Sequence, residues 1–180
     1  MKKTAGILKF LCSIALFFEG VAGVIVAFAV GALLFMGDFS HISLTTNQAI
    51  EIQGDSLTPE QMNALKPVIL VAALIAMASI VFAFLGTSKF RKALGECKKE
   101  TPFTTTSINA IKASARYEII GGLVGIIGSI VLYVMGQGIK VNGTSVASSM
   151  NTIHLTFLIY AAEKYLLYHI AQYGHSLENK

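Results

Sequence analysis

The chain has 180 residues, a length typical of one domain, and 54% of them are hydrophobic while only 13% are charged. Soluble domains carry about a quarter charged residues, so this composition argues against an ordinary water-soluble protein. The net charge of +4 is too small to indicate direct binding to nucleic acid. The charged residues are bunched between long apolar runs, which is typical of an integral membrane protein.

Four apolar stretches are long enough to cross a bilayer, which takes about 20 mostly apolar residues in a helix. They run from about 10 to 36, 67 to 85, 119 to 135 and 152 to 173. The first follows two lysines as a signal peptide would, but it continues far beyond the roughly 7–15-residue core of such a peptide. Because backbone polar groups cannot face lipid, each stretch is expected to be helical. The sequence therefore predicts an all-α integral membrane protein, with residues 1–180 forming a single four-transmembrane-helix bundle.

The basic residues predict the orientation of this bundle. Eleven Lys and Arg residues lie in the N-terminal tail, the loop between the second and third stretches, and the C-terminal tail, whereas only Lys66 and Lys140 lie in the other two loops. The positive-inside rule places both termini and the middle loop in the cytoplasm. Cys12 and Cys97 then both lie on the cytoplasmic side, where a structural disulfide is not expected.

The two outer loops carry local structural signals. Residues 40–54 mix β-branched and polar side chains, which is compatible with a short hairpin or an irregular loop. Thr58-Pro59-Glu60-Gln61 resembles a capping box with proline at the first helical position. A short helix is expected to begin there, with room to lie on the outer membrane surface and to kink at Pro67 before the second span. Asn142-Gly143 is expected to be a turn.

The middle loop is predicted to be a helical hairpin that extends into the cytoplasm. Apolar residues recur at helical spacing after Gly86, Pro102 forces an extended step, and residues 104–107 offer several helix N-caps before the next helical pattern. The basic residues of this hairpin are expected to lie near anionic lipid, and they also form a candidate docking surface for a cytoplasmic partner. These residues are Lys89, Arg91, Lys92, Lys98 and Lys99.

Small residues at spacings of four mark two faces for close helix packing. One consists of Gly121, Gly125 and Ser129, and the other consists of Gly23, Ala27 and Gly31. The spacing leaves open whether each face packs within one chain or between chains in a homo- or hetero-oligomer. A bulky residue in place of Gly125 is predicted to disrupt the fold.

Three charged residues fall within predicted spans, where charge is costly and is usually paired or functional. They are Glu19, Glu163 and Lys164. Glu19 and Lys164 each lie ten residues from the inner end of their helix, which is about 15 Å of depth. We therefore predict that Glu19 and Lys164 lie within salt-bridge or one-water distance of each other, with Glu163 close by, if the first and fourth helices are neighbours. This cluster is either a structural ion pair or a site for a ligand or for proton relay.

No pattern indicates catalysis, a metal or a cofactor. There is no CxxC pair, no histidine spacing resembles a metal site, and no nucleophile lies at a recognisable spacing from a base. We therefore expect that the protein is not an enzyme.

Two segments resemble a known family. They are Phe90-Arg91-Lys92-Ala93-Leu94 followed by Glu100-Thr101-Pro102-Phe103-Thr104, and Ala171-Gln172-Tyr173-Gly174-His175-Ser176-Leu177-Glu178. Together they are similar to the bacterial four-helix membrane family known as domain of unknown function 2975. In that family a Gly-x-Pro-Phe-Ser/Thr step leads into the third span, and a Tyr-Gly-x-x-Leu-x-x-Glu tail follows the fourth. Here Glu100-Thr101 replaces the glycine step, and the chain ends near the position of the last Glu. The resemblance would cover nearly the whole chain. It implies a location in the bacterial plasma membrane and a regulatory role, because the genes of family members often lie beside those of small helix-turn-helix regulators.

Three functions follow as hypotheses. The first is a non-enzymatic membrane regulatory protein that binds a cytoplasmic partner, with a helix-turn-helix transcription regulator as the candidate, through the middle loop and the C-terminal tail. The second is a small-molecule or ion-handling protein that uses the three charged residues within the spans. The third is an immunity or assembly subunit that binds another membrane protein through its glycine faces.

Overall fold

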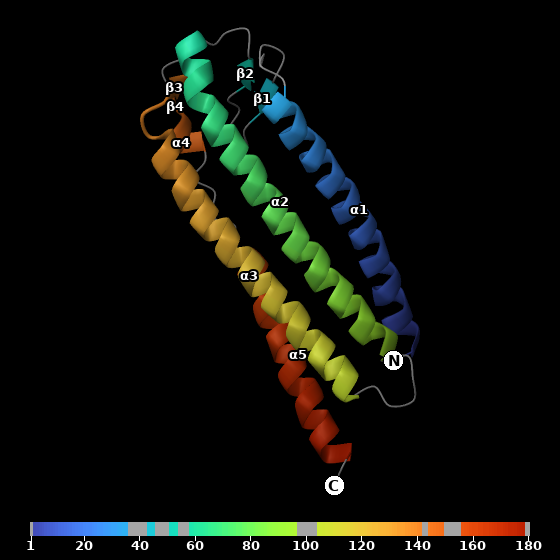
Figure 1. Ribbon diagram of the computed structural model, residues 1–180. Helices are drawn as coiled ribbons and strands as arrows, with labels where there is room; N and C mark the ends of the chain where they lie inside the picture. The colour runs from blue at the N-terminus through green and yellow to red at the C-terminus, as the bar shows by residue number, and fades with distance from the viewer. Residues whose placement is uncertain are drawn as a thin grey trace. The chain divides into compact units, whose positions relative to one another are not determined.

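The computed structural model is helical and describes most of the chain. The residues it describes are 2–35, 43–45, 51–53, 58–96, 104–141, 144–149 and 156–178. The elements in chain order are α1 (Lys2–Phe35), β1 (Ser43–Thr45), β2 (Glu51–Gln53), α2 (Pro59–Glu96), α3 (Thr105–Gly136), β3 (Lys140–Val141), β4 (Thr144–Ser145), α4 (Val146–Ser149) and α5 (Thr156–Glu178) (Figure 1). The helical architecture predicted from the sequence is therefore confirmed.

Three of the described helices are long and apolar enough to cross a membrane, namely α1, α2 and α3. Their apolar segments are Lys3–Ala32, Asn63–Glu96 and Thr105–Gly136, each well beyond the roughly 20 residues that a crossing needs. The first residues of the predicted fourth span, 152–155, lie outside the described part of the chain.

The chain divides into two compact units. Unit 1 comprises Met1–Gly23, Ser79–Leu123 and Leu155–Lys180, and unit 2 comprises Val24–Ala78 and Val124–His154. The three long apolar helices contribute to both units. Unit 1 also contains all of α5, and unit 2 contains the short strands.

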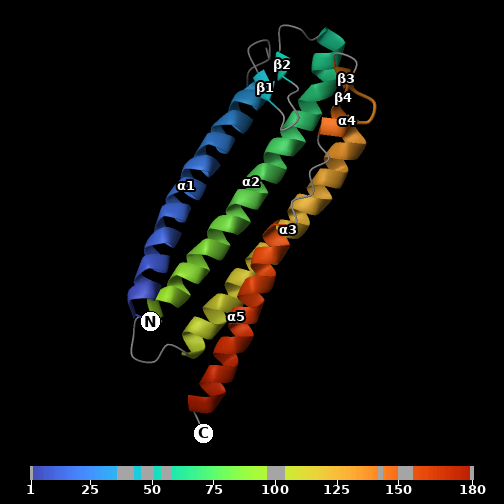
Figure 2. The ribbon, with the colours of Figure 1, turned by 180° about the vertical axis from the view of Figure 1, so that it is seen from behind.

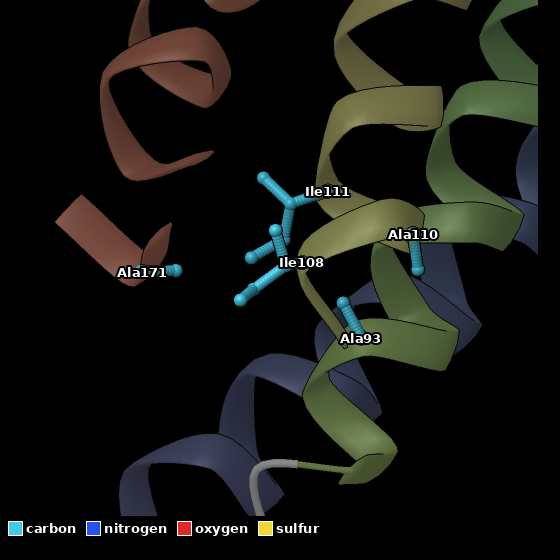
Figure 3. Close-up of a cluster of buried hydrophobic side chains, with 5 residues drawn as sticks. All are labelled: Ala93, Ile108, Ala110, Ile111 and Ala171. Atoms are coloured by element: carbon cyan, nitrogen blue, oxygen red, sulfur yellow. The ribbon is translucent and has the colours of Figure 1, made fainter. Parts of the chain in front are cut away.

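In unit 1, α5 runs antiparallel to the first half of α3, as two contacts show. The Lys112 ammonium lies 5.1 Å from the centre of the Tyr168 ring, and Ala171 packs against the turn that holds Ile108 and Ile111. The two isoleucines extend from α3 toward α5 in the close-up of Figure 3, and the ribbon seen from behind shows α5 beside this part of α3 (Figure 2). The core of unit 1 therefore joins α2, α3 and α5.

Hydrogen bonds confirm both helix starts that the sequence predicts. The Thr58 N–H donates to Gln61 Oε1 at 3.0 Å and the Gln61 N–H donates to Thr58 Oγ1 at 3.3 Å, which is a reciprocal capping box at the start of α2. The Ser107 N–H donates to Thr104 Oγ1 at 3.1 Å at the start of α3. The helix that begins at the Thr58 cap leads into the second span as predicted, because α2 continues through Pro67 as one helix to Glu96.

The loop segments that the structure describes are two small hairpins in unit 2. β1 and β2 pair antiparallel with Leu44 opposite Ile52, which decides for the hairpin over the irregular alternative. β3 and β4 pair with Val141 opposite Thr144, so only two residues connect them. The predicted turn at Asn142-Gly143 itself lies outside the described residues.

The predicted glycine faces are only partly correct. A Cβ added at Gly121 would lie 3.1 Å from Phe82 Cβ in unit 1, and one added at Gly128 would lie 2.6 Å from an Ile75 methyl in unit 2. One added at Gly125 would meet nothing within 4 Å among the described residues, so Gly125 makes no close contact there and its packing against another chain stays a prediction. Gly121 and Gly128 are seven residues apart and therefore lie on one face of α3, whereas Gly125 is rotated by about 40–60° around the helix axis from each of them. Ser129 bonds within its own helix, donating to the Gly125 carbonyl at 2.9 Å.

The second predicted face has one neighbour within the chain. Gly23 lies in ordinary contact with Ile80, since an added Cβ would be 3.5 Å from its methyl. Gly31 has nothing within 4 Å of an added Cβ, and Ala27 is exposed beside it. Packing of the Ala27–Gly31 part against another chain stays a prediction.

Candidate charged site in unit 1

Four polar side chains from four helices meet in unit 1, and together they are termed the charged site. They are Glu19 of α1, Thr87 of α2, Glu118 of α3 and Lys164 of α5. Lys164 Nζ forms an ion pair with Glu118 Oε1. The Thr87 hydroxyl donates to Glu19 Oε1 at 2.9 Å. Lys164 Nζ also lies 5.1 Å from the centre of the Phe90 ring, where a cation is attracted to the aromatic face.

The charged site holds more negative than positive groups. Lys164 and Glu118 both act electrostatically on Glu19, so the three ionisable groups lie within range of one another. Two carboxylates face one ammonium, and ionisation of all three would leave one uncompensated negative charge. Glu118 and Lys164 have side chains that are only 8% and 16% exposed. An uncompensated charge in such surroundings is unfavourable, because water cannot solvate it.

Each carboxylate has one oxygen with a partner and one without. Oε1 of Glu118 contacts Lys164 and Oε1 of Glu19 accepts from Thr87. Oε2 of both residues is buried and has no hydrogen-bond partner among the described residues. Buried oxygens are rarely left unpaired in native proteins, so each such atom requires an explanation.

Gly86 positions Glu118 by allowing α2 and α3 to approach closely. An added Cβ at Gly86 would lie 3.3 Å from Glu118 Cγ and 3.5 Å from the Ser114 carbonyl oxygen. The Ser114 hydroxyl donates to the Gly86 carbonyl at 2.8 Å, and Ser114 is fully buried. Ser114 and Glu118 are four residues apart and share one face of α3. The missing side chain at Gly86 therefore leaves the room that Glu118 occupies.

The acid in direct contact with Lys164 is not the predicted Glu19, although Glu19 lies within electrostatic range of the lysine. Lys164 pairs with Glu118, which sequence reasoning assigned to the end of the cytoplasmic loop and left out of the site. Glu118 follows Ile111 by seven residues and Ala115 by three, so it lies on the stripe of α3 that the apolar residues define. Glu118 could have been recognised from the sequence, because it is a carboxylate on a stripe of α3 that is otherwise buried.

Glu163 does not belong to the charged site. Its side chain is exposed, whereas that of the neighbouring Lys164 is largely buried. Consecutive residues of an α-helix point about 100° apart, so both could not face the same cluster. The prediction that Glu163 lies with the other charges is therefore wrong.

The predicted basic surface contains a groove between α2 and α3, termed the basic groove. It has a volume of about 270 Å³ and is lined by Lys89, Lys92, Thr106, Asn109, Ala110 and Ala113. Arg91 is exposed on α2 but does not line the groove. Lys98 and Lys99 lie outside the described residues.

The residues described in the structure contain no group of three side chains that could hold a metal ion. Cys12 is a free thiol. Comparison with protein families, curated proteins and solved structures found no match for this chain.

Proposed function

We propose that the chain is a four-helix integral membrane protein with both termini in the cytoplasm, and that it is a non-enzymatic regulator which holds an acidic cytoplasmic partner in the basic groove. The observation that carries this proposal is a change in the exposed surface of α2 and α3. Exposed large apolar side chains on α2 end at Phe84, and on α3 they begin only at Ile120. Those positions match the ends of the second and third spans predicted from the sequence.

Beyond these positions the helices have the character of a water-facing pair. Among the described residues between Phe84 and Ile120 the exposed side chains are polar, including Ser88, Arg91 and Asn109. The apolar residues there are partly or fully buried, several of them in the cluster that contains Ala93 and Ile108. Lipid-facing helices expose apolar residues, whereas helices in water bury them, so this pattern supports a hairpin in the cytoplasm.

The α1 and α5 helices support a position at the membrane boundary. In unit 1, α1 exposes Phe10 and Phe17, and α5 exposes Ile170 and Leu177. Unit 1 thus has a polar side on the hairpin and an apolar side on α1 and α5. In our proposal the apolar side lies on the membrane surface while the hairpin faces water.

This arrangement changes the limits proposed for the fourth span. The inner ends of the third and fourth spans were predicted at residues 119 and 173. Because Lys164 lies beside Glu118, these two residues cannot lie at the same depth in the membrane. Lys164 precedes residue 173 by nine residues, which is about 13 Å of helix. The part of α5 beyond Lys164 then runs along the hairpin near the membrane boundary.

The chemistry of the basic groove suits an acidic protein segment. Lys89 and Lys92 supply two cationic groups, and Thr106 and Asn109 supply hydrogen-bonding groups on the facing helix. Attraction between exposed charges weakens as salt increases, so binding is expected to be salt-dependent. The family resemblance suggests a helix-turn-helix regulator as the partner, which would contact DNA itself while this chain does not.

Site-specific photocross-linking tests the proposal. A photoreactive residue replaces Asn109 in the full-length chain, which is expressed in the membranes of its source cells. We expect a cross-link to a soluble cytoplasmic protein, and Lys89→Glu with Lys92→Glu should reduce the yield at least fivefold. Arg91→Glu is the matched control, because it reverses a charge on the same hairpin outside the groove. Cross-links to membrane proteins alone, or equal losses in the control, would contradict the proposal.

A further inference from the structure

We propose that the charged site binds one exchangeable proton, held on Glu19 and shared with Glu118. This site is distinct from the basic groove, and the inference does not depend on the docking function. It rests on two buried carboxylate oxygens that have no hydrogen-bond partner in the described part of the chain, one of them on a side chain more than nine-tenths buried. Glu118 is 7% exposed, and its Oε2 and that of Glu19 are the two atoms concerned.

One proton would account both for the two carboxylate oxygens without partners among the described residues and for the excess negative charge of the charged site. As a hydroxyl on Glu19 Oε2 it is a donor, and the Glu118 Oε2 is an available acceptor, directly or through one water. The same proton neutralises the excess charge, since Glu118 and Lys164 compensate each other. Glu19 is the acid that takes it because its hydrogen-bond partner among the described residues is the neutral Thr87 hydroxyl, while Glu118 has the ammonium.

The charged groups that act on Glu19 are Lys164 of α5 and Glu118 of α3. Cys12 on α1 and Arg91 on α2 interact electrostatically with one another, and Cys12 also interacts with Glu19 and Lys164. Arg91 is exposed, so solvent screens its charge. Lys164 is thus the buried cation available to either carboxylate.

Release of the proton would make the site bistable. With Glu19 ionised, Lys164 could form an ion pair with either of two carboxylates, one on α1 and one on α3. A change of partner would alter how α5 is held against those two helices. The site therefore couples the binding of one proton to helix packing in unit 1.

Infrared spectroscopy of the full-length protein in lipid tests this inference. A protonated carboxyl has a C=O stretch separate from that of carboxylates, and it shifts in heavy water. At neutral pH we expect a band equivalent to one protonated carboxyl per chain. Glu19→Gln should remove it, and Glu163→Gln, the exposed acid next to Lys164, should leave it unchanged. A band that persists in Glu19→Gln, or no band in the wild type, would overturn the proposal.

Two further measurements test whether Lys164 interacts with both acids and whether the site holds a proton or a metal cation. In Glu118→Gln, Glu19 is the acid of the charged site that remains for Lys164, so Glu19 should ionise and the band should disappear; a band that persists would show that Lys164 does not interact with Glu19. Replacing potassium with sodium should not affect the wild-type band. Loss of the band in sodium would show that a metal cation takes the place of the proton and would overturn the assignment. Glu19→Gln is expected to fold, because an amide has the shape of the protonated acid.

Discussion

The Lys164→Met substitution tests the ion pair with Glu118. It removes the ammonium and leaves the Glu118 carboxylate, which is 7% exposed, without its partner. Stranding one charge of a buried pair costs about 3–5 kcal/mol, and the 16% exposure of the lysine favours the lower end, about 3 kcal/mol. For a chain of this size each kcal/mol lowers the melting temperature by roughly 2–4 °C. A thermal melt of the full-length protein in mild detergent should therefore show a drop of about 6–12 °C.

The double variant decides whether this loss comes from the pair. Glu118→Gln combined with Lys164→Met strands no charge, so it should melt at a higher temperature than Lys164→Met alone. Glu163→Gln changes an exposed acid of α5 outside the charged site and should stay within about 0.5 kcal/mol of the wild type. If the two single effects simply add in the double variant, Glu118 and Lys164 are not coupled and the charged site is wrong.

Two other substitutions test the packing and the start of α2. Gly128→Leu should destabilise the folded protein by about 1–3 kcal/mol, because its Cβ would lie 2.6 Å from Ile75. Gly125→Leu is the control and should melt like the wild type, because its Cβ would have nothing within 4 Å among the described residues. Equal melting temperatures of the two variants would contradict the packing of α2 on α3. Thr58→Ala removes one of the two capping-box hydrogen bonds and should lower stability by about 1 kcal/mol, while a rise or no change would show that the cap does not form in the folded protein.

Local signals predicted the helices and their starts well. The capping residues Thr58 and Thr104 bond to groups within one helical turn, so three or four residues are enough to predict where the helix begins. The apolar spacing after Gly86 likewise predicted that α2 continues, and it ends at Glu96. These features depend on neighbouring residues along the chain, which a single sequence displays.

Contacts between helices were harder to predict, because they depend on the rotation and depth of each helix. Glu118 was placed at a loop end, although α3 had already begun at Thr105. The pairing of Lys164 with Glu118 instead of Glu19 follows from the antiparallel register of α5 on α3, which no local pattern contains. For the same reason the spacing of Gly121 and Gly125 could not tell which of them contacts α2.

Cysteine labelling tests most directly whether unit 1, with the proposed hairpin between α2 and α3, faces the cytoplasm. Cys12 and Cys97 are replaced by serine, and single cysteines are placed at Ser88 in the hairpin and Thr144 in β4. A membrane-impermeant thiol reagent is added to intact cells and to permeabilised cells. We predict that Thr144→Cys reacts in intact cells and that Ser88→Cys reacts only after permeabilisation. Reaction of Ser88→Cys in intact cells would contradict the orientation and, with it, the docking of a cytoplasmic partner.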